Sequence, residues 1–554
     1  MYQEKPKDQK EPTERKKDPR DIWAKFTNGK NYKSGEKMYD IIRRNEEYYA
    51  GEQWRGVEAK GLPTPVLNFL EQLVDVKVST LMSNELTIHR RPSDLTDDDY
   101  LATLAAKAFN LMDKRNWDRL RMEQINEQVL LDGALSGLGA TYWYWDNDIR
   151  YGNNFRIAGD IKCEVLDSVN LYVSNPNDDC IQNQDWVIIS SRKTVPQARK
   201  MAKKAGLKQS EIDMIQGDED TVYEAFEKAQ NEQDSEKGSQ YVTVLTYFYK
   251  KYNEETEKIE VYFCRSIQNV MIQKETPTEL QRYPIAIMQW KRRKRFIYGT
   301  AEITSIIANQ QHINKMEAMR QLHAQLMAIP KVGYNRNMIA GMTNTVGGIL
   351  PINAQPGDDI SKAIHYWQPT AMSIDVDKSI ESTLQKTREY KGINDNVIGA
   401  AKAENTSAII AQQRAAGVPL ESVKRRFWHY LRDVALLWNE FYTTKYNTPR
   451  IVSDIETGEK IMFTGTEFKD VILDTMIDVG ASTQWSDALS AETLDRLLDR
   501  GHIDIKHYLQ RYPKNIIPDQ DKLIEDIEIQ RQEAIMQQLP QHAGQIPMGG
   551  GGLG

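Results

Sequence analysis

Residues Thr300–Leu326, TAEITSIIANQQHINKMEAMRQLHAQL, carry a helical pattern that decides how the surrounding chain folds. Apolar side chains recur every three or four residues along it, which places them on one face of an α-helix. At about 1.5 Å per residue, such a helix is roughly 40 Å long. The opposite face is polar and bears Gln310, Gln311, His312 and Asn314. The stretch therefore predicts one long amphipathic helix.

A second helix is predicted a short distance further along the chain. The insert between the two, Pro330–Gln368, is rich in glycine and proline and contains VGGILPI and AQPGDD. This composition is typical of loops and turns. The second helical pattern then runs from Asp375 to about Lys391. Two predicted helices therefore flank a compact insert.

The stretch Gly392–Gly417, GINDNVIGAAKAENTSAIIAQQRAAG, follows this second helix. Turn-forming residues in its first half make a continuous helix unfavourable. Helical character resumes near Asn405, which can cap the new helix. One interpretation is a surface connection between helices, and the other is a functional loop inside a helical scaffold. In the second case the candidate residues are Asn394, Asp395, Asn396, Lys402, Glu404 and Asn405.

Helical and strand patterns are mixed elsewhere, so the predicted fold class is α+β with several domains. Tyr100–Leu138 predicts two helices that break near Asn116, and Tyr142–Trp145 is a typical strand sequence. In Lys258–Cys264, KIEVYFC, apolar and polar side chains alternate. This alternation predicts an antiparallel layer with one face in water.

Both ends of the chain are predicted to be flexible. Residues 1–35 are polar with interspersed charges, so they are expected to bury too little apolar area to offset the entropy of ordering. They match neither a secretory signal nor a lipidation site, so the protein is expected to stay in the cytoplasm where it is made. The tail MGGGGLG is glycine-rich and is expected to be mobile.

The length of 554 residues predicts two to four domains. A hydrophobic content of 40% and a charged content of 27% describe an ordinary soluble globular protein. The apolar runs are shorter than the roughly 20 residues needed to cross a bilayer, so no membrane partner is expected. A net charge of -7 argues against tight binding through many phosphates. Any DNA contact is therefore expected to be local or loose.

Motifs for catalysis or cofactor binding are absent from the sequence. It contains no GxxxxGKS or GxxxxGKT phosphate loop, no HExxH zinc pattern and no GxSxG nucleophile elbow. Three scattered cysteines are too few for a zinc site or a disulfide framework. The acidic pair Asp178 and Asp179 is more typical of a solvated turn than of a nuclease magnesium site. We therefore expect no catalytic residue, no metal and no cofactor.

The strongest cluster of like charge is Lys291, Arg292, Arg293, Lys294 and Arg295. It lies between a predicted strand and the long helix. Such a run is most simply a solvated face. Its position at a junction between predicted domains also allows a contact with an anion or a DNA backbone.

Several segments of the chain follow one another in a recognisable order. The first is RRNEEYYAGEQW, Arg43–Trp54, followed by PTPVLNFLEQLVDVKVSTLMSNE. Then come NLYVSNPNDDCIQNQDWVIISSRKTVPQARK, YGTAEITSIIANQQHINKM and AENTSAIIAQQRAAG. Taken in this order, the segments resemble the portal proteins of tailed double-stranded DNA bacteriophages. The similarity covers roughly Glu36–Trp438 and lies in the order of the segments more than in any one motif. Many relatives carry Ser-Gly after the loop, where this chain has Ser407 and Ala408.

The resemblance implies a ring-shaped homo-oligomer, typically of twelve subunits, at one capsid vertex around a DNA channel. Carried over by position, the regions are a flexible arm at 1–35, a wing at 36–298 and 421–484, stem helices at 299–328 and 373–391, a clip at 329–372, a channel loop with its following helix at 392–420, a helical crown at 485–538 and a flexible tail at 539–554. The implied clip contacts are Asn335, Arg336, Asn337, Asp358 and Asp359.

The expected function is that of a non-enzymatic portal through which double-stranded DNA is packaged and ejected. The expected partners are further copies of the chain, the DNA, the packaging terminase, the head-to-tail adaptor and the major capsid protein. Assembly is expected in the host cytoplasm, and the mature location is the virion. In a ring, Lys402 becomes a circle of positive charge that guides the phosphates weakly, and the basic run Lys291–Arg295 can face wound DNA or capsid protein.

Two other classes of protein stay open at this point. A terminase-type nuclease needs clustered acidic residues in a strand-based core. A tail or scaffold interaction protein forms no closed ring.

Overall fold

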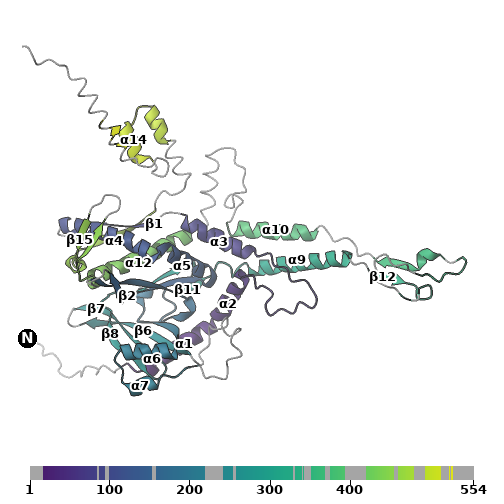
Figure 1. Cartoon of the computed structure of the whole chain (residues 1–554), viewed down its shortest axis with the longest axis horizontal. Helices are drawn as coiled ribbons and strands as arrows, with labels where there is room; N and C mark the ends of the chain where they lie inside the picture. The colour runs from purple at the N-terminus through teal and green to yellow at the C-terminus, as the bar shows by residue number, and fades with distance from the viewer. Residues whose placement is uncertain are drawn as a thin grey trace, which may run out of the picture. The chain divides into compact units, whose positions relative to one another are not determined.

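The structure, a computed structural model, describes residues 17–83, 86–93, 99–151, 157–218, 241–253, 257–328, 331–339, 341, 351–357, 359–367, 375–392, 420–453, 460–479, 493–512, 523–524, 526–527 and 529. The chain divides into two compact units. The first comprises Met1–Met82 with Ile88–Ile477, and the second comprises Ser83–Thr87 with Asp478–Gly554. Helices and antiparallel sheets together build the first unit (Figure 1), which confirms the α+β class.

Two antiparallel sheets form the centre of the first unit. The larger has the strand order β4-β5-β6-β7-β8, and the smaller has the order β3-β2-β9. The strands are β2 (Leu138–Tyr151), β3 (Ile157–Leu166), β4 (Leu171–Val173), β5 (Trp186–Thr194), β6 (Tyr241–Asn253), β7 (Lys258–Ser266), β8 (Met271–Pro277) and β9 (Ile285–Gln289). The predicted antiparallel arrangement of β7 is therefore confirmed.

A hydrophobic core joins the two sheets. It contains Leu138 and Ala140 of β2 together with Phe248 of β6, none of which is exposed. α2 (Met38–Tyr49) adds Ile42 to the same core. Because side chains alternate between the two faces of a strand, these residues use only one face of the larger sheet.

The other face of the larger sheet is covered by α1 (Pro19–Gly35), so the prediction of a flexible arm over residues 1–35 is wrong for this helix. The side chain of Asp18 caps it by accepting a hydrogen bond from the backbone nitrogen of Arg20 at 2.9 Å. Ile22 and Phe26, one turn apart, are buried in a cluster with residues of β4, β5, β6 and β7.

The prediction of a sheet face in water fails for the same reason. The strand β6 is buried at successive positions on both faces, as expected for a strand with cover on each side. In β7, Ile259 is 56% exposed while Glu260 is buried. The alternation in the sequence therefore did not predict which face of the larger sheet is in water, because α1 covers the face that was expected to be exposed.

Two short helices pack on the face of the larger sheet opposite α1, because their cluster contains Val242 and Val244, which share a face of β6 with Phe248. α6 (Val195–Lys204) begins with a capping box formed by Thr194 and Gln197. Its Ala198 pairs with residues of α7 (Gln209–Asp213) and β6 in a separate hydrophobic cluster. The sequence predicts a helix from Pro196 to Ala205, and α6 confirms it.

The smaller sheet packs against α4 (Asp99–Leu120), α5 (Met122–Ser136) and α12 (Glu421–Lys445). Trp143 of β2 meets Trp438 of α12 edge to face, with ring centroids 5.5 Å apart. The sequence predicts a core-facing helix here from an apolar stripe, and the burial of its members confirms it: Val423, Phe427, Leu431, Val434, Trp438 and Phe441.

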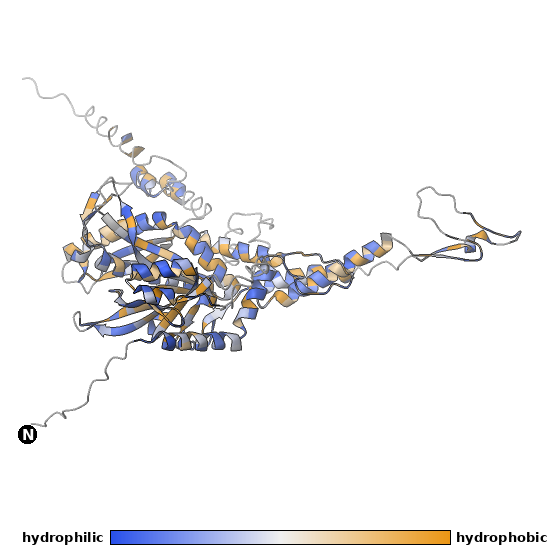
Figure 2. Ribbon diagram, turned by 60° about the horizontal axis from the view of Figure 1, so that its bottom comes forward, coloured by the Kyte–Doolittle hydropathy of each residue, from blue (hydrophilic) through white to orange (hydrophobic). Residues whose placement is uncertain are grey.

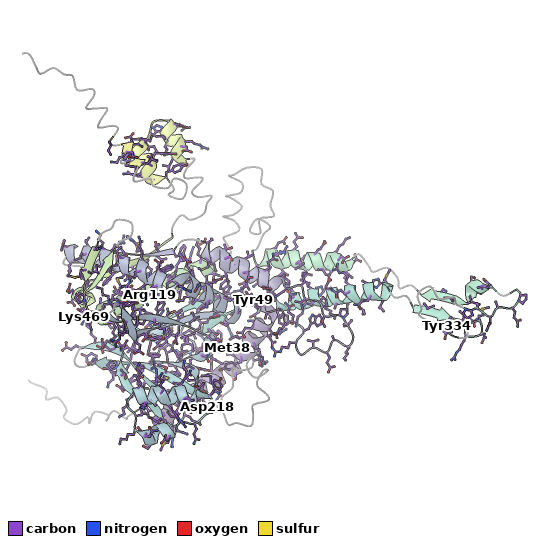
Figure 3. The ribbon with its side chains drawn as sticks, viewed as in Figure 1. Met38, Tyr49, Arg119, Asp218, Tyr334 and Lys469 are labelled. Atoms are coloured by element: carbon purple, nitrogen blue, oxygen red, sulfur yellow. The ribbon has the colours of Figure 1, made fainter. Side chains whose placement is uncertain are left out.

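The break between the two early helices lies at Arg121, which has a φ of 53°, and not near Asn116 as predicted. Asn116 stays inside α4 because its buried side-chain amide donates to the Tyr442 hydroxyl at 2.9 Å. The sequence predicts a helix from Asn68 to about Met82, which α3 (Phe69–Met82) confirms. It is tied to α2 by the hydroxyl of Tyr49 (Figure 3), which donates to Asp75 at 2.8 Å.

The long helix is confirmed as α9, although it spans Ile307–Ala328 and does not begin near Thr300. The residues before it form β11 (Phe296–Thr300), which pairs with β10 (Lys291–Arg293). Strand pairing takes only Thr300 of the expected helix, and residues 302–306 form bends and turns that lead into α9.

α10 (Asp375–Tyr390), the second predicted helix, lies beside α9. The Asn309 side-chain amide donates to the Thr387 hydroxyl at 2.9 Å, and Arg320 is 3.6 Å from Asp377. Figure 2 shows hydrophilic and hydrophobic residues interleaved along both helices. The two helices therefore form a pair held by polar contacts along its length.

The insert contains a small antiparallel pair of strands, β12 (Lys331–Tyr334) and β13 (Ile364–Trp367). Ile339 and Ala363 are fully buried beside it. Tyr334, at the end of β12, is 42% exposed (Figure 3).

The sequence predicts a hairpin centred on the turn ETGEK at Glu456–Lys460, and the strands β14 (Arg450–Ser453) and β15 (Lys460–Phe463) confirm this hairpin. The strand after it, β16 (Leu473–Val479), pairs with β1 (Leu86–Pro92). In the second unit, residues 493–499 are helical and α14 spans Ile505–Arg511. Among the helices that the structure describes, none combines the length and apolar character of a bilayer span.

Candidate functional site

The basic run Lys291–Arg295 forms the first strand and the turn of the hairpin β10–β11. Two of its arginines form ion pairs with carboxylates of the same chain. The Arg292 Nε atom lies 2.6 Å from an Asp179 carboxylate oxygen, and Arg293 lies 3.1 Å from Glu36. The Arg293 guanidinium also stands 4.5 Å from the centre of the Phe296 ring. These contacts fix the hairpin to neighbouring segments.

The remaining cations of the run have no such contacts. Lys291, Lys294 and Arg295 are exposed, and no acidic group among the described residues lies within ion-pair distance of them. Arg295 has a φ of 57°, a left-handed conformation that places it in the turn of the hairpin. Within the run, Arg292 and Arg293 are therefore ion-paired, whereas Lys291 at the start of β10 and the turn residues Lys294 and Arg295 have no ion pair with a described residue.

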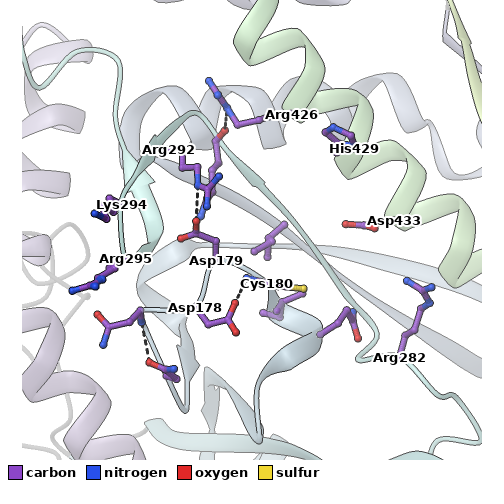
Figure 4. A pocket seen from close by; sticks show the side chains of 16 residues that line it. Asp178, Asp179, Cys180, Arg282, Arg292, Lys294, Arg295, Arg426, His429 and Asp433 are labelled. Carbon is purple, nitrogen blue, oxygen red and sulfur yellow. Dashed lines mark hydrogen bonds and ion pairs between the residues drawn. The ribbon is translucent and has the colours of Figure 1, made fainter.

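A cavity of about 1070 Å³ lies next to this turn (Figure 4). Its walls come from the loop before β5, from β9, from the hairpin and from α12. Its charged and titratable lining residues are Arg282, Arg292, Lys294, Arg295, Arg426, His429, Asp178, Asp179 and Asp433. The lining is therefore mixed in sign with an excess of positive charge.

The acidic wall of the cavity is built by turns. Asp178 accepts a hydrogen bond from the backbone nitrogen of Cys180 at 2.9 Å, as expected for a turn residue. Asp179 binds Arg292 through one carboxylate oxygen, while its other oxygen is buried and has no partner among the described residues. The two carboxylates thus have separate roles and do not act as a pair.

The wall provided by α12 is held to the small sheet. The Arg426 guanidinium donates to the carbonyl oxygens of Gln289 at 2.9 Å and Trp290 at 2.6 Å. Burial lowers the pKa of Arg426. Burial also raises the pKa of Asp433, although the nearby Arg282 opposes this effect.

The candidate residues of the insert are partly used to shape its own backbone. The Asn335 side-chain oxygen accepts from the Asn337 nitrogen at 3.0 Å. Asp359 accepts hydrogen bonds from the Ser361 hydroxyl at 2.5 Å and from the Ser361 backbone nitrogen at 3.1 Å, and these two hydrogen bonds lower the pKa of its carboxyl. Arg336 is exposed, whereas Asp358 lies outside the described residues.

The candidate channel-loop residues, Asn394, Asp395, Asn396, Lys402, Glu404 and Asn405, all lie outside the described residues. The structure does describe the chain on both sides of them. α10 ends at Tyr390, and Gly392 follows with a φ of 71°, the left-handed conformation that often ends a helix.

Sequence reasoning missed the contributions of Arg282, Arg426, His429 and Asp433 to the cavity. No local motif could have identified them, because the cavity is assembled from segments far apart in the chain. Within the described part of the chain, no three His, Cys, Asp or Glu side chains are grouped closely enough to hold a metal ion. The site is thus a surface of mixed charge suited to binding.

Comparison with protein families gives one match. The model of the family described as phage P22-like portal protein matches residues 30–484. A search of curated proteins finds no match for this chain.

Proposed function

The chain belongs to the phage P22-like portal protein family, and on this basis we propose that twelve copies close into a ring around a channel for double-stranded DNA. As a phage portal protein it is a component of the virion, located at a capsid vertex, where DNA is packaged and ejected. The family match over residues 30–484 is the observation that carries this conclusion. The ring is assembled in the host cytoplasm before it enters the capsid.

The regions of the subunit follow the positions given by the resemblance. The two sheets and their helices belong to the wing at 36–298 and 421–484, and α1 extends it to residue 19. α9 and α10 are the stem helices, and the insert at 329–372 is the clip. Residues 392–420 form the channel loop and its following helix, and 485–538 form the crown.

Electron microscopy of negatively stained protein tests the ring directly. Top views should show rotational symmetry and a central hole. Isolated single subunits, or particles with a filled axis, would contradict the proposal. Incubation with double-stranded DNA and Mg²⁺ tests the nuclease alternative, which the family match does not favour, and cut ends would support that alternative.

The acidic balance of the chain supports a channel that does not hold its DNA. Contacts with roughly 6 to 10 phosphates give tight and strongly salt-dependent binding, which would resist sliding. A net charge of -7 per subunit works against such binding. In this setting Lys402 supplies a local ring of positive charge that guides the duplex.

The clip is the docking site for the terminase and later for the head-to-tail adaptor. Asn335 and Asp359 shape the turns, so the exposed Arg336 is the residue best placed for a charged contact. Replacing Arg336 with glutamate should weaken terminase binding in a pull-down assay. Replacing the exposed Lys386 of α10 with glutamate is the matched control and should leave binding unchanged.

The cavity beside the basic hairpin binds a protein, the major capsid protein, in preference to DNA. Its carboxylates, Asp178, Asp179 and Asp433, would repel phosphates, whereas a protein surface can match both signs of charge. The exposed Lys294 and Arg295 provide the unpaired positive charge at its edge.

Substitution of Lys294 and Arg295 by glutamate separates the two partners. Incorporation of the portal into procapsids should fall, while the affinity for DNA in a low-salt binding assay should stay the same. Lys274→Glu, an exposed change on β8, is the control. Loss of DNA affinity with normal incorporation would favour DNA as the partner.

A further inference from the structure

A buried carboxylate links three segments where α9 and α10 meet the sheets. Glu302 is 8% exposed, and one of its oxygens lies 2.7 Å from the Lys77 ammonium and 3.0 Å from the Lys391 ammonium. Its other oxygen accepts a hydrogen bond from the Trp290 indole at 2.7 Å. Burial by itself would raise the pKa of Glu302, but the two ammonium groups outweigh it and the pKa is lowered. The carboxylate is therefore ionised, and both of its oxygens have partners.

The end of α10 is held by this cluster. Besides its ion pair, the Lys391 ammonium donates to the Glu302 backbone carbonyl and to the Ser305 hydroxyl, each at 2.8 Å. Lys391 is the residue after the last residue of α10, and Gly392 follows it. The point at which the chain leaves the helix is thus fixed by three contacts of one side chain.

The chain that follows residues 393–419 also contacts the surroundings of Glu302. At the start of α12 the Arg426 guanidinium donates to the carbonyl oxygen of Trp290 at 2.6 Å. The indole of this same Trp290, which is fully buried, binds Glu302. Its backbone nitrogen donates to the Gly137 carbonyl at 3.0 Å, which anchors it to the small sheet. The contacts before and after residues 393–419 therefore converge on Trp290 and Glu302.

The ion pairs of Glu302 with Lys77 and Lys391 define the geometry of these segments more than they stabilise the fold. Two lysines share one carboxylate, so the buried group carries an excess positive charge, and burial lowers the pKa of Lys77. Buried ion pairs contribute little net stability compared with apolar packing of the same volume. They do impose a defined geometry, because each charge must keep its partner.

We infer that Trp290 and Glu302 are positioning residues that fix both ends of the channel-loop segment, with Lys391 holding one end and Arg426 the other. The inference rests on the proposed function only in naming that segment a channel loop. The anchoring itself concerns described residues alone. The two anchors are linked through the hydrogen bond from the Trp290 indole to Glu302, because Lys391 contacts Glu302 and Arg426 contacts Trp290. A loss of contacts at one end should therefore also loosen the other end.

Hydrogen–deuterium exchange on assembled rings tests this coupling. In Lys391→Met, amides at residues 388–392 should exchange at least about tenfold faster, as expected for the loss of charge-assisted hydrogen bonds. Amides at residues 421–426, which Lys391 does not touch, should also exchange faster. Lys391→Arg keeps the cation and should restore slow exchange, and the exposed Lys386→Met is the control.

Trp290→Phe provides a second test, because it keeps a buried ring but removes the indole donor. It should speed exchange at both ends, and it remains informative if Lys391→Met fails to assemble. Faster exchange confined to residues 388–392 in both variants would overturn the inference. Faster exchange at both ends with normal DNA packaging would leave the anchoring intact and refute the role of the segment in the channel.

Discussion

Replacing Asp132 with asparagine should remove a pH dependence from the stability of the first compact unit. Asp132 lies on α5, where burial and then the negative charges of Asp167 and Glu46 raise the pKa of its carboxyl to about 7. The unfolded chain gives the same group a pKa of about 3.9. The folded protein therefore binds this proton more tightly than the unfolded chain does.

The sign and size of the effect follow from this difference. As the pH rises, the unfolded chain ionises first, so stability is lost from about pH 4 up to about pH 7 and is constant above that. Between pH 5 and pH 8 the loss is at most about 2.5 kcal/mol, because partial exposure of the side chain reduces it. The asparagine variant has no proton to lose, and its advantage over the native chain should grow with pH.

Urea denaturation followed by tryptophan fluorescence measures this difference. Native protein and Asp132→Asn are compared from pH 5 to pH 8 at constant ionic strength and protein concentration. Asp118→Asn, an exposed carboxylate on α4, is the control and should follow the native curve. Parallel curves for native protein and Asp132→Asn would refute the reasoning.

Other substitutions test separate parts of the molecule. Lys402→Glu should leave ring assembly intact and reduce DNA packaging, and unchanged packaging would remove its guiding role. Gly465→Ala should lower the free energy of unfolding by about 2 to 4 kcal/mol in a denaturant titration, because the added Cβ would collide with the Tyr442 carbonyl oxygen. Asp113→Asn should lower the free energy of unfolding by about 3 to 5 kcal/mol in the same titration. The Arg90 guanidinium is fully buried and lies 2.6 Å from the Asp113 carboxylate, so the substitution leaves it without a counter-charge. A decrease of less than about 1 kcal/mol would contradict this prediction.

Periodicity alone located most helices. The stripes in α10 and α12 were visible because each apolar face repeats within one element. The sequence also held a signal for α1, in the Asp18–Pro19 start and the Ile22 and Phe26 spacing. The high charge of residues 1–35 nevertheless led to the prediction of a flexible arm. This charge belongs to the solvated side of the helix and gives no information about the side that packs against the sheet.

The sequence by itself determined the family resemblance, the amphipathic helices and the hairpins, because these depend on residues close together in the chain. Only the tertiary structure decided which charges are paired. Arg292 is held by Asp179 and Glu302 by Lys77, partners that are remote in sequence and recognisable only once the chain brings them within about 3 Å. The same reason explains α1, since whether a strand face is wet depends on what another segment lays over it.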